Sequence, residues 1–173
     1  VEHFCEQNSE VYFIDIDIKA SKELIKNIKQ KKLRTPNFIE CNILDIKKLQ
    51  NTIQEIINKK GPIHCLINSA ANDDRHTTEQ VDEKYWENRM GINLKHYFFA
   101  AQAVVKGMKK IKTGSIVNLS SVSWMLGEGD KVVYETAKSA VIGLTRSFAQ
   151  EFGKYNIRTN SVIPGSIATE RDR

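Results

Sequence analysis

Apolar residues in this chain recur first with the period of a strand and then with the period of a helix, and this change repeats along its length. Short apolar runs at residues 11–14, 38–41, 63–67, 115–119 and 157–163 are typical of strands. Residues 21–33, 49–57, 83–110 and 133–152 have the helical pattern. Strands that alternate with helices build a parallel sheet with helices on both faces. The pattern therefore predicts a doubly wound α/β fold, as a single domain over residues 1–173.

Polar residues stand where the expected strands end. They are Asp15, Asn42, residues 68–71 (Asn-Ser-Ala-Ala), Ser120 with Ser121, and Pro164 with Gly165. Ligands of open parallel sheets bind beyond the carboxyl ends of the strands. Nearly every candidate for chemistry therefore falls at one edge of the predicted sheet.

The helix expected over residues 133–152 has Tyr134 and Lys138 four positions apart, so that both project from one face. A phenol has a pKa near ~10, and a nearby ammonium lowers it. Such a tyrosine could exchange protons near neutral pH. Ser121, thirteen positions before Tyr134, could bind the same substrate oxygen. Taken alone, this spacing is common on helix surfaces, and only its surroundings favour the catalytic interpretation.

The helix expected over residues 83–110 has an apolar stripe that one amide interrupts. The stripe consists of Trp86, Met90, Asn93, Tyr97, Ala101, Val104 and Met108. A buried amide costs about 1–3 kcal/mol if it is unpaired. Asn93 therefore has either a functional role or the role of capping a local helix distortion near Gly91.

Composition narrows the classes of function. The net charge is +5, but no aromatic residues interleave with the lysine clusters, so we do not expect a nucleic-acid partner. No apolar run approaches the ~20 residues that span a bilayer. The three cysteines lack a C-x-x-C pair and the four histidines are scattered, so we expect no metal site and favour a reducing cytoplasm.

Four motifs, in the expected order, resemble those of the short-chain dehydrogenases/reductases. Residues 68–71 look like the N-N-A-G motif of that family, and Asn93 matches its catalytic asparagine. Ser121 matches the catalytic serine, and Tyr134 with Lys138 matches Y-x-x-x-K. Pro164-Gly165 with Ile167 and Thr169 matches a segment near the nicotinamide. The resemblance implies a Rossmann-like oxidoreductase with a nicotinamide cofactor.

The same resemblance implies a role for each catalytic residue. Tyr134, as a phenolate, would take the proton of the substrate hydroxyl while a hydride leaves for the nicotinamide. Lys138 would hold the phenolate and the cofactor ribose, Ser121 would orient the reacting oxygen, and Asn93 would help to hold a water that relays protons through Lys138. The implied cofactor-binding residues are Asp15, Asn42, Ile43, Asn68, Ala70, Tyr134, Lys138, Pro164, Gly165, Ile167 and Thr169.

In the family, the residue at the end of the second strand decides whether NAD or NADP is preferred. A carboxylate there binds the adenosine ribose and repels a 2′-phosphate, so Asp15 favours NAD. Asp17 could serve instead, and Lys19 leaves room for NADP. Either aspartate could also be a helix cap or a turn residue.

A narrower resemblance concerns the substrate. Residues 72–76, 85–89, 93–96 and 121–124, with 134–138, look like the sugar 1-dehydrogenase branch, which oxidises C1 of an aldose to a lactone. The implied substrate residues are Asp74, Arg75, His76, Ser123 and Trp124. The alternative is that this charged cluster only ties down a loop. Alternative functions are a 3-oxoacyl-carrier-protein reductase, another alcohol dehydrogenase, or a truncated, non-catalytic Rossmann-like scaffold.

The chain departs from the family pattern at both ends. The glycine-rich turn that would hold the cofactor pyrophosphate is missing. The residues that the family has after its sixth strand are not in this sequence either. We therefore expect a fold truncated at both ends, with unpaired edges at the two strands that would flank the missing one. Such a segment should bind its cofactor weakly by itself. Relatives form tetramers or dimers, so a homo-oligomer through the Asn93 and Tyr134 helices is also expected.

Overall fold

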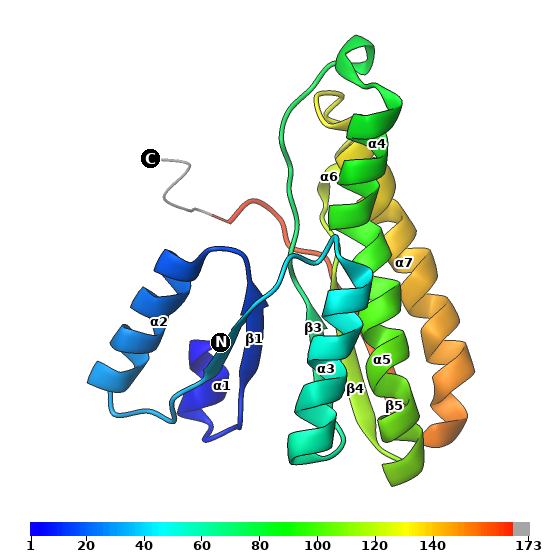
Figure 1. The fold of residues 1–173 in the computed structure, drawn as a ribbon. Coiled ribbons are helices and arrows are strands. Elements are labelled where there is room, and N and C mark those ends of the chain that lie inside the picture. Colours follow the sequence, from blue (N-terminus) through cyan, green and yellow to red (C-terminus); the bar gives the residue numbers. More distant parts are fainter. Residues whose placement is uncertain (168–173) are drawn as a thin grey trace. The chain divides into compact units, whose positions relative to one another are not determined.

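The computed structural model describes residues 1–167, which fall into two compact units divided between Thr52 and Ile53. Each unit is described by itself, and Figure 1 shows the course of the chain through both. The α/β class with parallel strands is confirmed. A single domain over residues 1–173 stays a prediction.

The first unit contains one pair of parallel strands. Its elements are α1 (Glu2–Glu6), β1 (Tyr12–Asp15), α2 (Ile18–Gln30), β2 (Asn37–Glu40) and the start of α3 (Ile46–Lys60). In the register, Tyr12 lies opposite Asn37 and Asp15 opposite Glu40. Asp45 caps the start of α3, since its Oδ1 accepts from the Lys48 amide at 2.9 Å.

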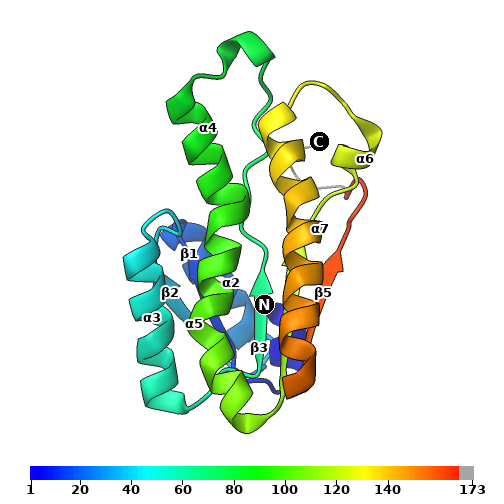
Figure 2. The ribbon, with the colours of Figure 1, turned by 90° about the vertical axis from the view of Figure 1, so that its right-hand side faces the viewer.

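The second unit contains a three-stranded parallel sheet in the order β3-β4-β5. Its strands are β3 (Cys65–Asn68), β4 (Gly114–Leu119) and β5 (Ile157–Val162). Two long helices, α5 (His96–Ile111) and α7 (Val132–Phe152), lie side by side against one face of this sheet (Figure 2). The shorter elements are η1 (Thr78–Gln80), α4 (Glu83–Met90), η2 (Gly91–Lys95), α6 (Ser123–Leu126) and η3 (Gly153–Tyr155).

Strands β1 and β3 are edge strands. Among residues 1–167, β1 pairs with β2 alone and β3 pairs with β4 alone. Unpaired edges are thus observed at both strands, as the sequence predicts. Such edges expose unpaired backbone groups.

The long helix differs from its prediction in the middle. It runs without a break from α4 through η2 into α5, but η2 is π-helical. A π segment adds one residue to a turn, which rotates the residues on either side of it by about 100° relative to a regular helix. Tyr97, Ala101 and Val104 are buried as expected, whereas the placement of Trp86 in the same apolar stripe is wrong, because its side chain is 38% exposed.

Within residues 1–167, no helix combines the length and the apolar character that crossing a lipid bilayer requires.

Candidate active site

Ser121 and Tyr134 meet at the carboxyl end of β4. Ser121 follows the strand, Tyr134 lies in the first turn of α7, and the Ser121 side chain is close enough to lower the pKa of the Tyr134 phenol. The Ser123 amide and hydroxyl donate to Ser121 Oγ at 3.2 and 3.0 Å, which fixes the position of this oxygen. The structure thus brings together the predicted serine and tyrosine, with Ser123 beside them.

Lys138 lies one helical turn further along α7 and is only 1% exposed. Its Nζ donates to the Leu119 carbonyl at 2.8 Å and to Tyr97 Oη at 3.0 Å. The same atom lies 5.5 Å from the centroid of the Tyr134 ring. Burial lowers the pKa of Lys138 from 10.5 to about 8. At neutral pH the ammonium form therefore still dominates.

Tyr134 differs from its expected titration. Burial, the largest influence, raises the pKa of its phenol above the usual 10, and the hydrogen bond from Ser121 opposes this. The charges of Asp73 and Glu128 also raise this pKa, and the charge of Lys131 lowers it. Lys138 is not among the groups that lower this pKa, and its ammonium is bonded to Tyr97 and Leu119. In this conformation Tyr134 is a protonated phenol at neutral pH.

Asn93 is fully buried in the π-helical segment η2. Its Oδ1 accepts from the Asn72 amide at 2.8 Å, and its Nδ2 donates to the Asn72 carbonyl at 2.9 Å. The amide therefore pays its desolvation cost by closing on the backbone of one residue of the neighbouring loop. The alternative of a helix distortion near Gly91 is right about the position of Asn93, which lies in the π-helical segment. Its side chain binds the loop at Asn72 and does not cap the distortion. The proton-relay role stays a prediction.

Three side chains of the loop of residues 72–76 tie it to its surroundings. Asp74 accepts from Arg89 of α4 at 2.7 Å, and Arg75 forms an ion pair with Asp130. His76 is buried, with Nδ1 at 2.9 Å from Tyr85 Oη and Nε2 accepting from the Val133 amide at 3.3 Å. Because Nε2 accepts, the hydrogen-bond network assigns the proton to Nδ1. These contacts favour the loop-tying interpretation for Asp74 and His76.

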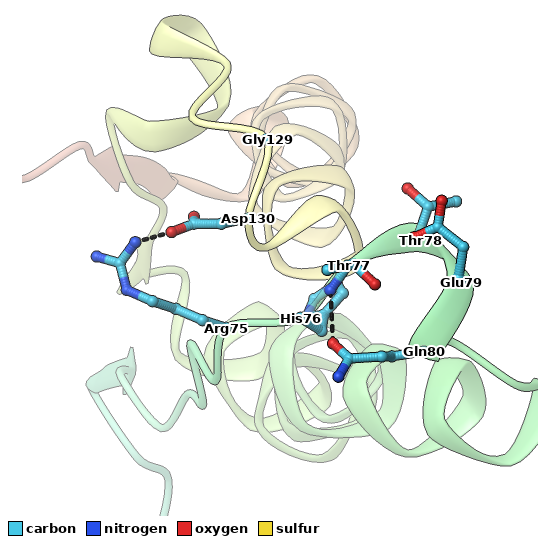
Figure 3. Close-up of a pocket in the computed structure, with 8 residues that line it drawn as sticks. All are labelled: Arg75, His76, Thr77, Thr78, Glu79, Gln80, Gly129 and Asp130. Carbon is cyan, nitrogen blue, oxygen red and sulfur yellow. Dashed lines mark hydrogen bonds and ion pairs between the residues drawn. The ribbon is translucent and has the colours of Figure 1, made fainter.

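A pocket of about 520 Å³ lies beside this loop. In Figure 3, Arg75 reaches across to Asp130, and the side chain of Gln80 turns back to the Thr77 amide. The pocket is lined by Arg75, His76, Thr77, Thr78, Glu79, Gln80, Gly129 and Asp130. Two predicted substrate residues, Arg75 and His76, line it, but Ser121 and Tyr134 do not. Trp124 is half-buried elsewhere, and its Nε1–H lacks a partner among the described residues.

The predicted cofactor residues of the second unit follow the strands that flank β4. Asn68 ends β3, and its Nδ2 donates to Asn118 Oδ1 at 2.9 Å, so its side chain joins two strands. Ala70 is exposed. After β5, the Pro164 carbonyl accepts from the Val122 amide at 3.1 Å, and Gly165 and Ile167 are exposed; Thr169 lies outside the described residues.

The remaining cofactor candidates belong to the first unit. Asp15 is exposed, and its Oδ1 accepts from the amides of Ile16 and Asp17 at 2.7 and 2.9 Å. No described residue bonds to its Oδ2. Asn42 Oδ1 accepts from the Leu44 amide at 3.0 Å, and Ile43 is half-buried. Asp17 caps α2 through the Ala20 amide, so the alternative of a helix cap holds for Asp17, and Asp15 acts as a turn residue.

A nicotinamide dinucleotide fits these donors in part. An ammonium has three N–H groups. Lys138 uses two of them on Tyr97 and Leu119, which leaves one for a ribose hydroxyl. In the first unit, taken by itself, the exposed Asp15 Oδ2 can accept from a ribose hydroxyl. The sequence holds no glycine-rich turn for the pyrophosphate. Within residues 1–167, no three side chains of the metal-binding types gather into a possible metal site.

Sequence reasoning missed two residues of this site, Tyr97 and His96. Tyr97 counted only as part of an apolar stripe, although it stands four residues after Asn93 and its hydroxyl contacts Lys138. His96 is buried against the Tyr97 ring, with centroids 4.4 Å apart, and its ring nitrogens have no hydrogen-bond partner among the described residues. The available signal was a phenol inside the apolar stripe, with an imidazole directly before it in the sequence.

His96 should make the protein sensitive to acid. The pKa of His96 is lowered from 6.5 to about 4, mainly by burial and in part by the charge of Lys138, while the nearby backbone of Gly91 and Ile92 opposes this. Between these two values the unfolded chain binds the proton and the folded chain does not, so stability falls as the pH falls. The full loss is on the order of 3 kcal/mol at 1.36 kcal/mol per unit.

Urea unfolding of the full-length protein at pH 7.5 and 4.5 measures this effect. We expect a smaller stability difference between the two pH values in His96→Leu than in the unchanged protein. An equal difference in both would mean that His96 is not held neutral by the fold.

Comparison with known proteins agrees with this arrangement. The whole chain, residues 1–173, matches the short chain dehydrogenase family. A probable galactose dehydrogenase of Rhizobium meliloti is 38% identical over 173 residues, which are 100% of this chain and 68% of that protein. A D-xylose 1-dehydrogenase of Caulobacter vibrioides is 38% identical over 168 residues, 97% of this chain and 66% of that protein.

A solved structure shares the fold. The gluconate 5-dehydrogenase of Burkholderia cenocepacia, crystallised with NADP and tartrate, superposes with a TM-score of 0.86 at 24% identity, over 98% of this chain and 66% of that one. The chain thus spans about two-thirds of the length of the relatives it matches. The prediction of a family of NAD(P)-dependent oxidoreductases is confirmed, and this chain belongs to the short-chain dehydrogenases.

Proposed function

We propose that the protein containing this chain is an NAD(P)-dependent dehydrogenase that oxidises an aldose at C1 to the lactone. The observation that carries the proposal is that the Ser121 side chain acts on the Tyr134 phenol and that the buried Lys138 ammonium lies 5.5 Å from the centroid of the same ring. The galactose and xylose dehydrogenases among its relatives support the choice of a sugar. Because those relatives are longer than this chain, the proposal concerns the full-length protein.

In the proposed reaction, the hydride acceptor is the nicotinamide ring when the cofactor is bound. Tyr134 Oη takes the proton of the C1 hydroxyl as the C1–H bond breaks and the C1=O bond forms. Ser121 Oγ donates to the same oxygen and stabilises the charge that develops on it. Ser123 fixes the direction of that donor, since its amide and hydroxyl both bond to Ser121 Oγ.

Tyr134 must lose its proton before it can act as the base. Burial now raises the pKa of its phenol, so catalysis requires a cation closer to the phenolate than Lys138 stands in this structure. Turning the Lys138 ammonium away from Tyr97 would supply one, because four residues separate Lys138 from Tyr134 on one helix face. Asn93 supports this arrangement by holding the Asn72 backbone, and its relay of protons through Lys138 is part of the proposal.

Substrate contacts form the next part of the proposal. The Trp124 Nε1–H is buried without a described partner, so it offers a donor to a sugar hydroxyl while its ring can cover the C–H face. Ser123 adjoins the catalytic serine. Arg75 lines the pocket beside the loop, whereas Asp74 and His76 already have protein partners and would act by shaping the loop.

Preference for NAD over NADP is also proposed. The support is Asp15, whose exposed carboxylate stands at the end of β1 and keeps Oδ2 free of described partners. A carboxylate at this place repels a 2′-phosphate. Asn42 and Ile43 would lie beside the adenine, and Asn68, Ala70, Pro164, Gly165 and Ile167 beside the rest of the cofactor.

A homo-oligomer through α5 and α7 belongs to the same proposal. Phe98 is 41% exposed on α5, and its ring lies 5.8 Å from that of Phe148 on α7. Phe148 is itself buried, so Phe98 on α5 is the exposed apolar side chain at this place that a second copy could cover. Light scattering of the full-length protein measures the number of subunits.

A panel of substrates on the full-length protein tests the function. Aldoses, 3-oxoacyl thioesters and simple alcohols are each offered with NAD or NADP (reduced forms for the thioesters), and absorbance at the nicotinamide band is followed. We expect turnover of an aldose with lactone as product, and a higher kcat/KM with NAD. Turnover of thioesters alone would replace the sugar proposal by a 3-oxoacyl-carrier-protein reductase, and no turnover would favour a non-catalytic scaffold.

A further inference from the structure

Lys138 sits in a closed triangle of hydrogen bonds. Its Nζ donates to Tyr97 Oη and to the Leu119 carbonyl, and Tyr97 Oη donates to the same carbonyl at 3.0 Å. All of the Tyr97 side chain is buried. Because the single phenol proton goes to Leu119, the lone pairs of Tyr97 Oη are left to accept from the ammonium.

The ammonium lies between two tyrosine rings. Its Nζ is 5.2 Å from the centroid of the Tyr97 ring on α5 and 5.5 Å from that of Tyr134 on α7. Of these two phenols, the Tyr97 hydroxyl is the one that accepts a hydrogen bond from Lys138. The lysine therefore has two phenols within reach and, in this structure, is bonded to the one that does not face Ser121.

No described carboxylate bonds to Lys138. The groups that face it are Tyr97 and His96 of α5, Tyr134 of its own helix and the Leu119 carbonyl of β4. His96 is neutral above about pH 4, so it supplies no positive charge near neutral pH. Asp73 and Glu128 act on Tyr134. Tyr97 and Leu119 are thus the two acceptors that compensate the buried ammonium.

We propose that Tyr97 is a positioning residue of the reaction, which keeps Lys138 charged inside the fold and holds its ammonium in reserve beside Tyr134. This rests on the proposed function for its catalytic consequence, but the bond between Tyr97 and Lys138 can be tested without turnover. Acceptors that bond to the charged form of a base stabilise that form. Removing the phenol oxygen leaves Leu119 as the one described acceptor.

The direction of the effect follows from this. Burial already lowers the pKa of Lys138 to about 8. Without the Tyr97 oxygen, the ammonium loses its proton at a still lower pH. Since the charged lysine is the form that stabilises the Tyr134 phenolate, turnover should then decline at a lower pH on the alkaline side.

The experiment is a titration of Lys138 in the full-length protein. Lysine labelled at Cε is followed by NMR between pH 6 and 11, and the Lys138 signal is assigned by its loss in Lys138→Met. We expect the midpoint to fall by about half a unit or more in Tyr97→Phe, the order expected for one lost hydrogen bond. Tyr155→Phe, which removes a phenol oxygen near Lys109 instead, is the matched control and should leave the midpoint unchanged.

Two further variants keep the test decisive. Tyr97→Leu also lacks an acceptor and replaces Tyr97→Phe if that variant does not fold. Tyr97→Gln keeps an amide oxygen and should return the midpoint toward that of the unchanged protein. An unchanged midpoint in the variants without an acceptor would overturn the proposal.

Activity supplies a second, separate readout. In the active enzyme, Tyr97→Phe should move the alkaline limb of the kcat profile to lower pH, with little change in the KM for the sugar. A uniform fall of kcat at every pH would mean a merely structural role and would also overturn the proposal. If no dehydrogenase activity exists, the proposed function fails, whereas the titration still decides the role of Tyr97.

Discussion

Tyr134→Phe is expected to lower kcat of the full-length enzyme by about 10²–10⁴-fold, the range that general acid–base groups contribute. The variant removes one oxygen and leaves the ring in place between Ser121 and Lys138. Because the ring keeps its packing, the fold and the cofactor affinity should change little. Stopped-flow measurement of nicotinamide reduction, with Tyr155→Phe as a control, checks the effect. Turnover within about threefold of the unchanged enzyme would exclude Tyr134 as the base.

Lys138→Met should also cost about 10²-fold or more in kcat near pH 7, since it removes the cation that lies 5.5 Å from the centroid of the Tyr134 ring. Burial alone then raises the pKa of Tyr134. The fraction of phenolate therefore grows about tenfold for each pH unit below that pKa. The remaining turnover should rise steadily with pH, unlike that of the unchanged enzyme.

A pH series of kcat for Lys138→Met measures this recovery. Lys109→Met is the matched control, because Lys109 packs on the rings of Phe152 and Tyr155 away from Ser121 and Tyr134. A low but pH-independent kcat in Lys138→Met would show that the lysine acts on something other than the ionisation of Tyr134.

Much of the second unit could be predicted because apolar residues repeat along each helix and strand with the spacing typical of that element. The strands near residues 63–67, 115–119 and 157–163 and the helix near 133–152 are observed within a few residues. Asp45 could be predicted as a cap, because capping is a local contact between a side chain and a nearby amide. The serine and tyrosine of the site could be placed together because the end of a central strand adjoins the start of the next helix.

The wrong predictions come from effects that the spacing of apolar residues in the sequence does not show. The inserted residue of η2 leaves the apolar pattern intact on each side but changes which face Trp86 presents. The choice of Lys138 between two phenols depends on Tyr97, which is forty-one residues away in sequence. The contacts of His76 and Asp74 likewise join distant segments. Only the folded arrangement reveals such pairings.

The bond from the Val133 amide to His76 Nε2 has one more consequence. Val133 precedes Tyr134 directly, so the loop of residues 72–76 supplies the acceptor for one of the otherwise unpaired amides at the start of α7. A ligand that displaces the loop must also release this helix start. Occupancy at the loop and the placement of the Tyr134 hydroxyl are thereby thermodynamically linked, and each biases the other by the same free energy.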